Sequence, residues 1–514
     1  MSWSISVTFR GQQATLQVTT ERIRVTPSEN SGEAEVHFAS SALAFAQLQH
    51  SPNRDSQRLR LVYLEPVKEE APDAPSVPSV RSVDVALDPG FDVSQIACNE
   101  TLSASLVPSS DSHNHCPIHV IVNDSAGRQG VASSFASRVV GPILLLSNSG
   151  DGSNLHLHKT QSALDGVRIG REIRQEQMDA VVVVLGGDGT VSEVVNGLLT
   201  EEDKSEVIDT RFKYEFVIVP LGTANAQYFH LFPPESGRLT PIKQQLGSLL
   251  SFVTKERAIP MSLAINRISS KDSALESPII STVVSSAALH AALLRDAEAL
   301  RTQVPGLERF KIAAQQNFTR WFRGSLHLSS KAQRYDSRSH SFVDASREEE
   351  LELRGPFSYF VSALVSRFEP TFVVAPLKDP LHKLAPNQGI ATIDVIVIRP
   401  LRDPDTQKFV DEAQNSEKRL QETRDAFAKK LWNVTAGMYD GGKHIDARYE
   451  DAEMDQPEIV EYYRCQQVEW RPAEDEDEKG RTVCLDGLLK DVGKGGRLKT
   501  STFSGSQQDI SVWA

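Results

Sequence analysis

The stretch from Val181 to Leu199 constrains the fold more than any other part of this sequence. It begins with a continuous apolar run, Val181-Val-Val-Val-Leu185, and passes through Gly186-Gly-Asp-Gly-Thr190 into Val191-Ser-Glu-Val-Val-Asn-Gly-Leu-Leu199. A β-branched run of this kind predicts a strand covered on both faces, and the apolar residues after the glycines recur at helical spacing. The sequence therefore predicts a buried strand, a glycine loop and a helix in succession, as in an α/β fold.

The glycine loop has the composition of a phosphate site. Gly186, Gly187 and Gly189 allow backbone N–H groups to approach an anion, and the helix start adds the positive end of its dipole. Asp188 is unusual in such a loop, because a carboxylate beside phosphates is useful mainly for handling Mg²⁺ or for accepting a proton from an attacking hydroxyl. The loop therefore indicates phosphoryl transfer rather than passive binding.

The same residues have a simpler interpretation as an ordinary strand-to-helix turn. Asp188 would then be solvated, since isolated glycine motifs recur by chance. With either interpretation, Thr190 and Glu193 are expected to form a capping box at the helix start.

Two more predicted strands end in loops of similar composition. Ile118-His-Val-Ile-Val122 is followed by Asn123-Asp-Ser-Ala-Gly-Arg-Gln-Gly130, and Phe216-Val-Ile-Val219 is followed by Pro220-Leu-Gly-Thr-Ala-Asn-Ala226. A helix after the first loop and a strand over Ile143–Leu146 would continue the β-loop-α-β order. Loops that follow parallel strands collect at one edge of the sheet, where α/β folds place their ligands. Three such loops predict one shared phosphate site.

The composition is that of an ordinary globular protein of two or more domains, with 39% hydrophobic and 24% charged residues in 514. A formal net charge of -13 argues against nucleic acid as the main partner. The start of the chain does not resemble a signal peptide, and no apolar run is long enough to cross a bilayer. We expect a cytoplasmic protein with peripheral membrane contact. The four cysteines are expected to be free thiols: Cys98, Cys116, Cys465 and Cys484.

The residue pattern divides the chain into segments. Alternating residues predict a β-rich module over 1–65, and a Pro, Ser and acidic composition predicts a linker over 66–115. An α/β domain is expected over 116–260 and a β-sandwich domain over 261–514. Within the latter, the polar stretch at about 403–422 and the acidic stretch at about 451–479 are expected to be surface insertions.

The loop at Gly186–Thr190 and the Ser-Glu-Val-Val-Asn-Gly-Leu sequence after it closely resemble the signature of the diacylglycerol kinase and sphingosine kinase catalytic family. The resemblance runs from about residue 116 to 487 and is closest to sphingosine (long-chain base) kinases. Asn123, Gly127 and Gly130 resemble the family's Asn-Pro-x-Ser-Gly-x-Gly segment, with Asp124 in place of the proline. The loop 220–226 resembles its Pro-x-Gly-Thr/Ser-Gly-Asn segment.

The resemblance implies an ATP-dependent lipid kinase with Mg²⁺, in which a β-sandwich domain holds the lipid. Asp188 is then the catalytic residue, which orients or deprotonates a lipid hydroxyl. The positions expected to bind the nucleotide are Asn123, Ser125, Gly127, Thr160, Gly186, Gly187, Gly189, Thr190, Gly222, Thr223, Asn225, Glu298, Arg301, Arg309 and Asp486.

The lipid side of the resemblance depends on one acidic residue. A sphingoid base, the acceptor expected first, needs a carboxylate for its ammonium group. Strict counting places Leu294 at the family's head-group position, and Asp296 is the neighbouring acid that we expect to bind the substrate. The simpler interpretation of Asp296, Glu298 and Arg301 is a solvated helix face.

Other functions compete with this one. Diacylglycerol or ceramide could be the acceptor instead, and relatives of NAD kinase or phosphofructokinase share Gly-Gly-Asp-Gly while acting on soluble substrates. A phosphate-binding regulatory domain is a further alternative. Leu488 also stands where the family's Asp-Gly-Glu segment, matched by Asp486 and Gly487, has its glutamate. The departures at Asp124, Leu294 and Leu488 fit a catalytically inactive protein that binds lipid or nucleotide.

Overall fold

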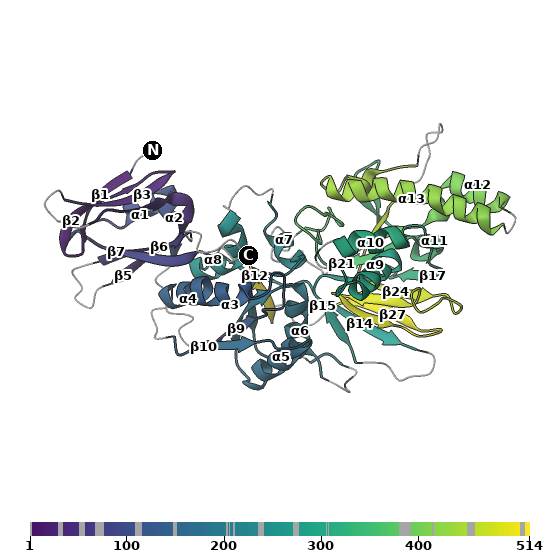
Figure 1. The fold of residues 1–514 in the computed structure, drawn as a ribbon, viewed down its shortest axis with the longest axis horizontal. Helices are drawn as coiled ribbons and strands as arrows, with labels where there is room; N and C mark the ends of the chain where they lie inside the picture. The colour runs from purple at the N-terminus through teal and green to yellow at the C-terminus, as the bar shows by residue number, and fades with distance from the viewer. Residues whose placement is uncertain are drawn as a thin grey trace.

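The chain forms three parts in a row: an N-terminal β module, an α/β domain and a second domain built from two sheets (Figure 1). All four cysteines are free, as expected. The computed structural model describes residues 3–28, 34–50, 57–66, 77–107, 116–147, 152–201, 204, 206–208, 211–234, 241–270, 277–304, 306, 308–379, 392–413, 416–449, 458–503 and 509–514.

The N-terminal module is one eight-stranded sheet in the order β4-β3-β2-β1-β7-β6-β5-β8. Alternate residues of its strands are buried, which is the pattern of a sheet with one face on a core. The elements are β1 (Trp3–Phe9), β2 (Gln12–Val18), β3 (Arg22–Pro27), β4 (Val36–Ala39), η1 (Ser40–Ala42), β5 (Leu43–His50), β6 (Gln57–Glu65), β7 (Ser79–Leu87), α1 (Ser94–Ala97), α2 (Glu100–Ser103) and β8 (Leu106–Val107).

The linker expected over 66–115 is wrong over its middle part. Strand β7 lies between β1 and β6, and β8 extends the sheet beside β5. Val83, Val85 and Leu87 alternate inward along β7 and supply buried apolar area that the proline-rich residues before them lack. Residues 67–76 and 108–115 lie outside the described residues.

The module shares a hydrophobic core with the α/β domain. Phe45 and Leu64 of the module are buried in the same cluster as Phe135 and Trp513 of the domain. The Gln47 side chain also donates to the Ser147 carbonyl at 3.2 Å. Because removing the module would expose this apolar surface, the two parts are packed as one unit.

The α/β domain is built on a six-stranded sheet in the order β10-β9-β11-β12-β28-β13. The strands from β10 to β28 run parallel, and β13 is antiparallel to β28. The predicted parallel α/β fold is confirmed. The strands are β9 (Ile118–Val122), β10 (Leu155–Lys159), β11 (Ala180–Gly186), β12 (Tyr214–Pro220), β13 (Ala258–Pro260) and β28 (Ile510–Trp513).

The expected boundary of the β-sandwich domain is wrong at strand β28. Residues 510–513 were expected in the β-sandwich domain, but they pair with β12 and β13 in the α/β sheet. Val512 and Trp513 are buried there, and the Trp513 ring lies against Phe252. The apolar alternation of Ile510, Val512 and Trp513 completes a sheet far away in sequence, which local patterns do not reveal.

Helices cover both faces of this sheet, and strand residues alternate between them. Val181, Val183 and Leu185 face one helical layer, and Val182 and Val184 face the other. The first layer contains α3 (Val131–Phe135), the π-helix η2 (Ala136–Val140), α4 (Gly141–Ser147) and α8 (Pro241–Thr254), and the second contains α5 (Asp165–Gln175), α6 (Asp188–Leu199) and α7 (Ala226–Leu231).

The strand expected over Ile143–Leu146 is wrong, because these residues lie in α4. Ile143 and Leu144 are buried, whereas Leu145 is 46% exposed. This pattern follows one face of a helix that continues directly from α3 and η2. A short apolar run cannot distinguish a strand from a buried helix turn.

The second domain contains two antiparallel sheets, as the predicted β-sandwich requires. One has the order β15-β14-β27-β24-β17-β20 and the other β19-β18-β23-β22-β21-β16-β25-β26. Residues from both, such as Trp470 and Phe360, form the core between them. The strands are β14 (Ala264–Ser269), β15 (Ile279–Ser281), β16 (Val284–Ala287), β17 (Gly324–Leu328), β18 (Gln333–Asp336), β19 (Ser341–Asp344), β20 (Glu352–Arg354), β21 (Tyr359–Ala363), β22 (Ile393–Ile398), β23 (Glu461–Cys465), β24 (Gln467–Pro472), β25 (Thr482–Leu485), β26 (Leu488–Asp491) and β27 (Arg497–Thr502).

Helices pack on the outer face of the second of these sheets. There α9, α10 and α13 enclose a further apolar cluster, which we call the outer-face cluster; it includes Leu289, Ala314, Tyr359, Val361 and Phe427. The helices of this domain are α9 (Ala288–Ala299), α10 (Glu308–Asn317), α11 (Glu348–Leu351), η5 (Pro400–Arg402), α12 (Pro404–Glu412), α13 (Glu417–Tyr439) and η6 (Lys443–Asp446).

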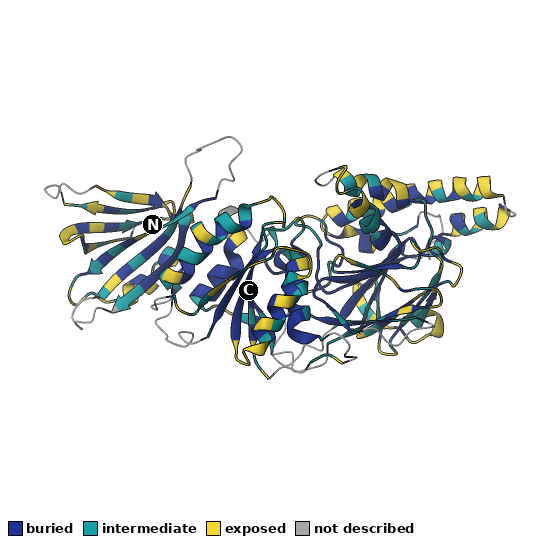
Figure 2. Ribbon diagram, turned by 60° about the horizontal axis from the view of Figure 1, so that its bottom comes forward, coloured by how far each residue is buried: buried dark blue, intermediate teal, exposed yellow. Residues whose placement is uncertain are grey.

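Of the two expected surface insertions, the first lies at the surface, whereas the second contains strands of the sheets. Residues 404–412 form α12 and residues 417–422 the start of α13, and both helices project with exposed sides (Figure 2). Within 451–479, however, β23 and β24 are internal strands of the two sheets, and Glu461 is buried. The resemblance to the family already indicated a strand over Val460–Cys465, where β23 lies. Glu461 of this strand is ion-paired with Arg399 inside the domain, and residues 451–457 lie outside the described residues.

Candidate active site

The three predicted loops meet at the carboxyl edge of the α/β sheet. They follow β9, β11 and β12, which are neighbours in the sheet. The backbone N–H groups of Leu221 and Gly222 both donate to the carbonyl of Gly186, at 3.0 and 3.1 Å. The loop after β12 is thereby fixed against the glycine loop at Gly186–Thr190.

The glycines allow these loops to touch one another. A Cβ on Gly222 would lie 2.4 Å from the Cα of Gly187, and one on Gly127 would lie 2.3 Å from the Leu221 carbonyl oxygen. Gly127 also has φ of +58°, which favours glycine. Gly189 differs, because a Cβ there would meet no atom within 4 Å. Gly127, Gly187 and Gly222 are thus required by loop-to-loop packing, whereas Gly189 borders open space.

Polar side chains of the predicted set tie the loops together. The Asn123 amide donates to the Thr190 hydroxyl at 2.9 Å, and its oxygen accepts from the Ser125 N–H at 3.0 Å. The Asn225 side chain brackets Gly222, accepting from its N–H and donating to its carbonyl, each at 2.8 Å. Asn225 and Thr190 are buried.

The expected capping box at Thr190 and Glu193 is wrong. Helix α6 begins at Asp188 with Gly187 as its N-cap, so Thr190 already lies within the helix. The Glu193 carboxylate instead accepts from the Gly166 N–H at 3.1 Å, which joins α6 to the start of α5.

Asp188 stands where the glycine loop, α6 and α7 meet. Its two carboxylate oxygens accept from the N–H groups of Ala226 at 2.8 Å and Gln227 at 2.9 Å. Desolvation of the carboxylate raises its pKa to about 6, despite the two N–H donors that oppose this shift. These donors are backbone groups of α7, which sequence motifs do not identify.

Thr160 and Asp124 occupy the outer part of the same edge. Thr160 directly follows β10, and its N–H donates to the Val122 carbonyl at 3.0 Å. The Asp124 carboxylate accepts from the N–H of Ser133 at 2.7 Å and from its hydroxyl. Asp124 therefore ties the first loop to α3, which gives a structural reason for the departure from proline.

Asp486 reaches this site from the second domain. Its carboxylate accepts from the N–H groups of Val283 at 3.0 Å and Val284 at 2.7 Å, at the start of β16. The negative charge of Asp486 helps to raise the pKa of Asp188, so the two carboxylates are close enough to interact. The Asn196 side chain also exchanges two 2.8 Å hydrogen bonds with the backbone of Ile280 in β15. The domain interface thus passes along α6.

The other predicted residues of the second domain lie on helices α9 and α10 or, for Arg301, just after α9. Glu298 and Arg301 pair with each other at 2.9 Å, with 55% and 61% of their side chains exposed. Arg309 lies on α10, and its guanidinium stacks over Phe310 at 4.7 Å. Helix α9 packs on β16, β21 and β25 of the second domain and against α10.

Asp296 is already engaged by its own domain. Its carboxylate accepts from Lys479 Nζ at 2.7 Å and from the Asn317 amide at 2.7 Å. Only 18% of the Asp296 side chain is exposed. A substrate ammonium would have to compete with a lysine for this carboxylate.

The loops fit a nucleotide phosphate better than they fit an isolated metal ion. The start of α6 leaves Gly189 exposed with free space above it, as an anion at a helix N-terminus requires. Asp188 and Asp486 use oxygens to accept backbone N–H groups, and the described residues contain no cluster of three or more His, Cys, Asp or Glu able to hold a metal. Asp188 is the carboxylate of the glycine loop that could hold a Mg²⁺ brought with the nucleotide, and the ion would neutralise phosphate charge.

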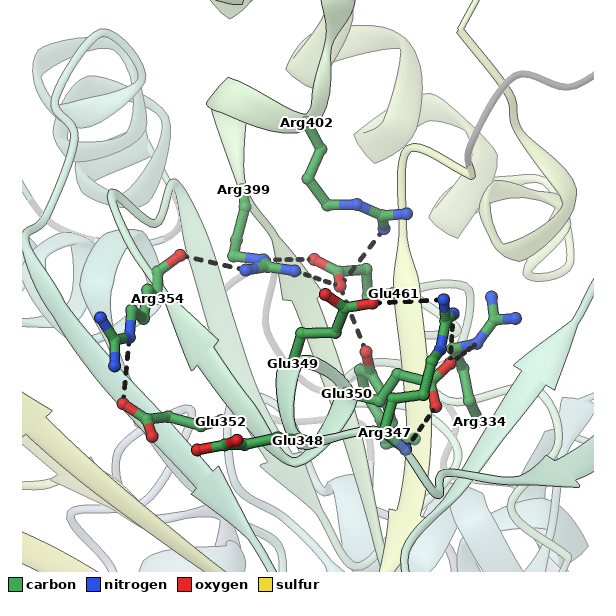
Figure 3. Close-up of a pocket in the computed structure, with 11 residues that line it drawn as sticks. Arg334, Arg347, Glu348, Glu349, Glu350, Glu352, Arg354, Arg399, Arg402 and Glu461 are labelled. Atoms are coloured by element: carbon green, nitrogen blue, oxygen red, sulfur yellow. Dashed lines mark hydrogen bonds and ion pairs between the residues drawn. The ribbon is translucent and has the colours of Figure 1, made fainter.

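A separate concavity of about 680 Å³ opens on the second domain, away from these loops (Figure 3). Glu461 is buried at its base and accepts from Arg399 at 2.7 and 2.8 Å. Arginines and glutamates balance in number around it, so it offers no net attraction for phosphate. Its lining comprises Arg334, Arg347, Arg354, Arg399, Arg402, Glu348, Glu349, Glu350, Glu352, Glu461 and Tyr463.

Residues 117–262 match the family model described as the diacylglycerol kinase catalytic domain. Over this part of its length, the chain is similar to diacylglycerol kinase catalytic domains. The matched residues include all three loops and Asp188, so the kinase function predicted from the motifs is confirmed. Among the described residues, no helix is long and apolar enough to cross a membrane.

Solved structures with a similar arrangement include kinases. A structure of a diacylglycerol kinase from Bacillus anthracis str. Sterne is 14% identical, with a TM-score of 0.38, covering 77% of this chain and 95% of that one. Yeast NADH kinase complexed with NADH is 9% identical, with a TM-score of 0.34, covering 78% and 84%. The comparison with curated protein sequences found no match.

Proposed function

We propose that this protein transfers the terminal phosphoryl group of ATP to a hydroxyl group of a lipid, and that Asp188 orients or deprotonates that hydroxyl. The observation that carries the proposal is the position of Asp188. It lies at the junction of the phosphate loops, and its partner Ala226 is also a buried member of the outer-face cluster. A phosphate side and an apolar side therefore adjoin the same carboxylate.

The protein's own groups would bind and position the nucleotide phosphates. The exposed start of α6 and the loops after β9 and β12 would bind the phosphates, and the hydrogen bonds among Asn123, Thr190, Asn225 and Gly222 keep these loops in place. Mg²⁺ bound with ATP would supply neutralisation of the phosphate charge. Phosphoryl transfer depends mainly on such positioning and electrostatics.

The electrostatic state of Asp188 suits a general base. With a pKa of about 6, it is ionised at neutral pH yet more basic than an ordinary aspartate. The N–H groups of Ala226 and Gln227 fix its orientation, and the nearby Asp486 adds to its basicity.

The acceptor that these surroundings favour is uncharged. The carboxylate expected to bind an ammonium group, Asp296, is occupied by Lys479 and Asn317. Ala226, whose N–H donates to Asp188, belongs to the same buried apolar cluster as Val283, Val284 and Leu289. Diacylglycerol or ceramide therefore fits better than a sphingoid base, the acceptor expected first from the sequence.

A lipid acceptor implies that the protein meets a membrane surface without crossing it. We propose a cytoplasmic protein with peripheral membrane association. Sedimentation with vesicles of phosphatidylcholine containing diacylglycerol would test this, and absence of binding at all lipid concentrations would oppose it.

The proposed function is tested with labelled ATP, Mg²⁺ and a panel of acceptors: diacylglycerol, ceramide, a sphingoid base and NAD. We expect a labelled lipid, with Asp188→Asn as the inactive control. Labelling of NAD alone would show a soluble-substrate kinase. Binding of ATP and lipid without transfer would show a catalytically inactive protein.

A further inference from the structure

Tyr359 on β21 carries a polar group that the fold leaves unused. Its side chain is 6% exposed, and its hydroxyl has no hydrogen-bond partner among the described residues. A hydroxyl that is buried without a partner destabilises the fold, because it has lost its hydrogen bonds to water. A buried group of this kind calls for a reason, and binding of a ligand is one.

The position of Tyr359 connects it to the proposed phosphoryl-transfer site. Its ring belongs to the outer-face cluster, which also contains Ala226, Val283 and Val284. The backbone N–H of Ala226 donates to Asp188, and those of the two valines donate to Asp486. A lipid whose hydroxyl reaches Asp188 would thus extend along the cluster in which Tyr359 is buried.

The polar ring that lies against Tyr359 is uncharged. The His290 ring lies edge-on to the Tyr359 ring, with 6.3 Å between centroids, and its Nδ1 is 2.7 Å from the Ser286 hydroxyl. Desolvation lowers the pKa of His290 to about 4, so the imidazole is neutral at physiological pH. This environment suits a neutral hydrogen-bond acceptor in apolar surroundings rather than an ionic head group.

We infer that Tyr359 selects the acceptor lipid by donating a hydrogen bond from its hydroxyl to an ester or amide carbonyl of an acylated, uncharged lipid. The inference rests on the proposed function and adds the chemical group that is recognised. A phenol in an apolar site is a directional donor, and an acyl carbonyl is the acceptor that such a lipid presents beside its hydroxyl. Sphingoid bases and dialkyl ethers lack this carbonyl.

The test compares an ester-linked diacylglycerol with the dialkyl ether of the same chain length, using wild type and Tyr359→Phe. We expect wild type to show a KM about 2- to 10-fold lower for the ester, as one hydrogen bond predicts. Tyr359→Phe should raise the KM for the ester to that for the ether, while the KM for ATP stays unchanged. Its melting temperature should not fall, because the lost hydroxyl has no partner in the protein.

Tyr335→Phe is the matched control, since Tyr335 is buried in the same cluster but its hydroxyl contacts His340 at 3.0 Å and Asp446 at 3.2 Å. This variant should lose stability and keep the ester preference. Equal KM values for ester and ether in wild type, or an ester preference that survives in Tyr359→Phe, would overturn the inference alone. Failure of wild type to phosphorylate any lipid would overturn both it and the proposed function.

Discussion

The loops of the α/β sheet and the second domain both contain residues matched to a kinase family. These residues are tightly packed and hydrogen-bonded in the loops, but several are exposed in the second domain. At the sheet edge, Gly187 and Gly222 approach too closely for side chains, and Asp188 is held by two N–H groups. At the end of α9, Glu298 and the following Arg301 are exposed and paired with each other. A short run of consecutive residues can identify a site that is built from backbone geometry. It does not identify a site that is built from long charged side chains.

The strongest test of this difference is Asp188→Asn, set beside Arg301→Ala. Loss of the carboxylate should lower turnover about 100- to 10,000-fold if it acts as a general base. An asparagine would also turn an N–H donor toward Ala226 or Gln227, so stability should fall by about 1–3 kcal/mol. Steady-state kinetics and chemical denaturation measure the two effects. Arg301→Ala should change turnover little, and an equal loss in both variants would remove the distinction between the regions.

The pH dependence of the rate sharpens the role of Asp188. Its pKa is raised to about 6, so the carboxylate gains a proton as the pH falls through that value. Only the ionised form can accept a proton, and the rate should therefore fall about tenfold for each pH unit below about 6. Initial rates at saturating ATP between about pH 5 and pH 8 provide the measurement. A rate that stays constant down to about pH 5 would contradict a base at this position.

Gly222→Ala tests the packing of the loops. Its Cβ would lie 2.4 Å from the Cα of Gly187, which is backbone and cannot move aside as a side chain can. Overpacking of this kind costs about 1–3 kcal/mol, so we expect a lower melting temperature and weaker stabilisation by Mg-ATP. Unchanged ATP stabilisation would show that the spacing of these loops is not needed for the nucleotide.

Gly189→Ala separates ligand space from packing space. No atom lies within 4 Å of the added Cβ, and alanine favours a helix over glycine by about 1 kcal/mol. The melting temperature without ligand should therefore stay the same or rise, while the shift produced by Mg-ATP should decrease. A full ATP shift in this variant would place the phosphates elsewhere.

The smallest effect is expected for Asp296→Asn. The change removes the charge opposite Lys479, and such a partly exposed pair is worth about 0–1 kcal/mol. The KM values for ATP and for a sphingoid base should both change by less than about twofold. A large rise in the KM for the sphingoid base alone would restore Asp296 as a head-group ligand and would make the second domain as predictable as the first.

The sequence predicted the parallel sheet, its three loops and the central position of Asp188, because periodicity and glycine spacing are local properties. It also indicated Asp486, which does adjoin Asp188. Tertiary pairing escaped it: β7 was taken for a linker, Ile143–Leu146 for a strand, and β28 for part of the sandwich. The N–H donors of Ala226 and Gln227 and the ion pair of Asp296 with Lys479 depend on segments far apart in sequence, which a single sequence does not bring together.

Strand β28 affects the order in which the two domains can be completed during synthesis. It fills the place between β12 and β13, and Tyr214 pairs with Ile510 almost three hundred residues later. During synthesis, the α/β sheet therefore lacks an internal strand until the whole second domain has been made. The loops around Asp188 therefore lie on a sheet that cannot be complete before the second domain has been synthesised.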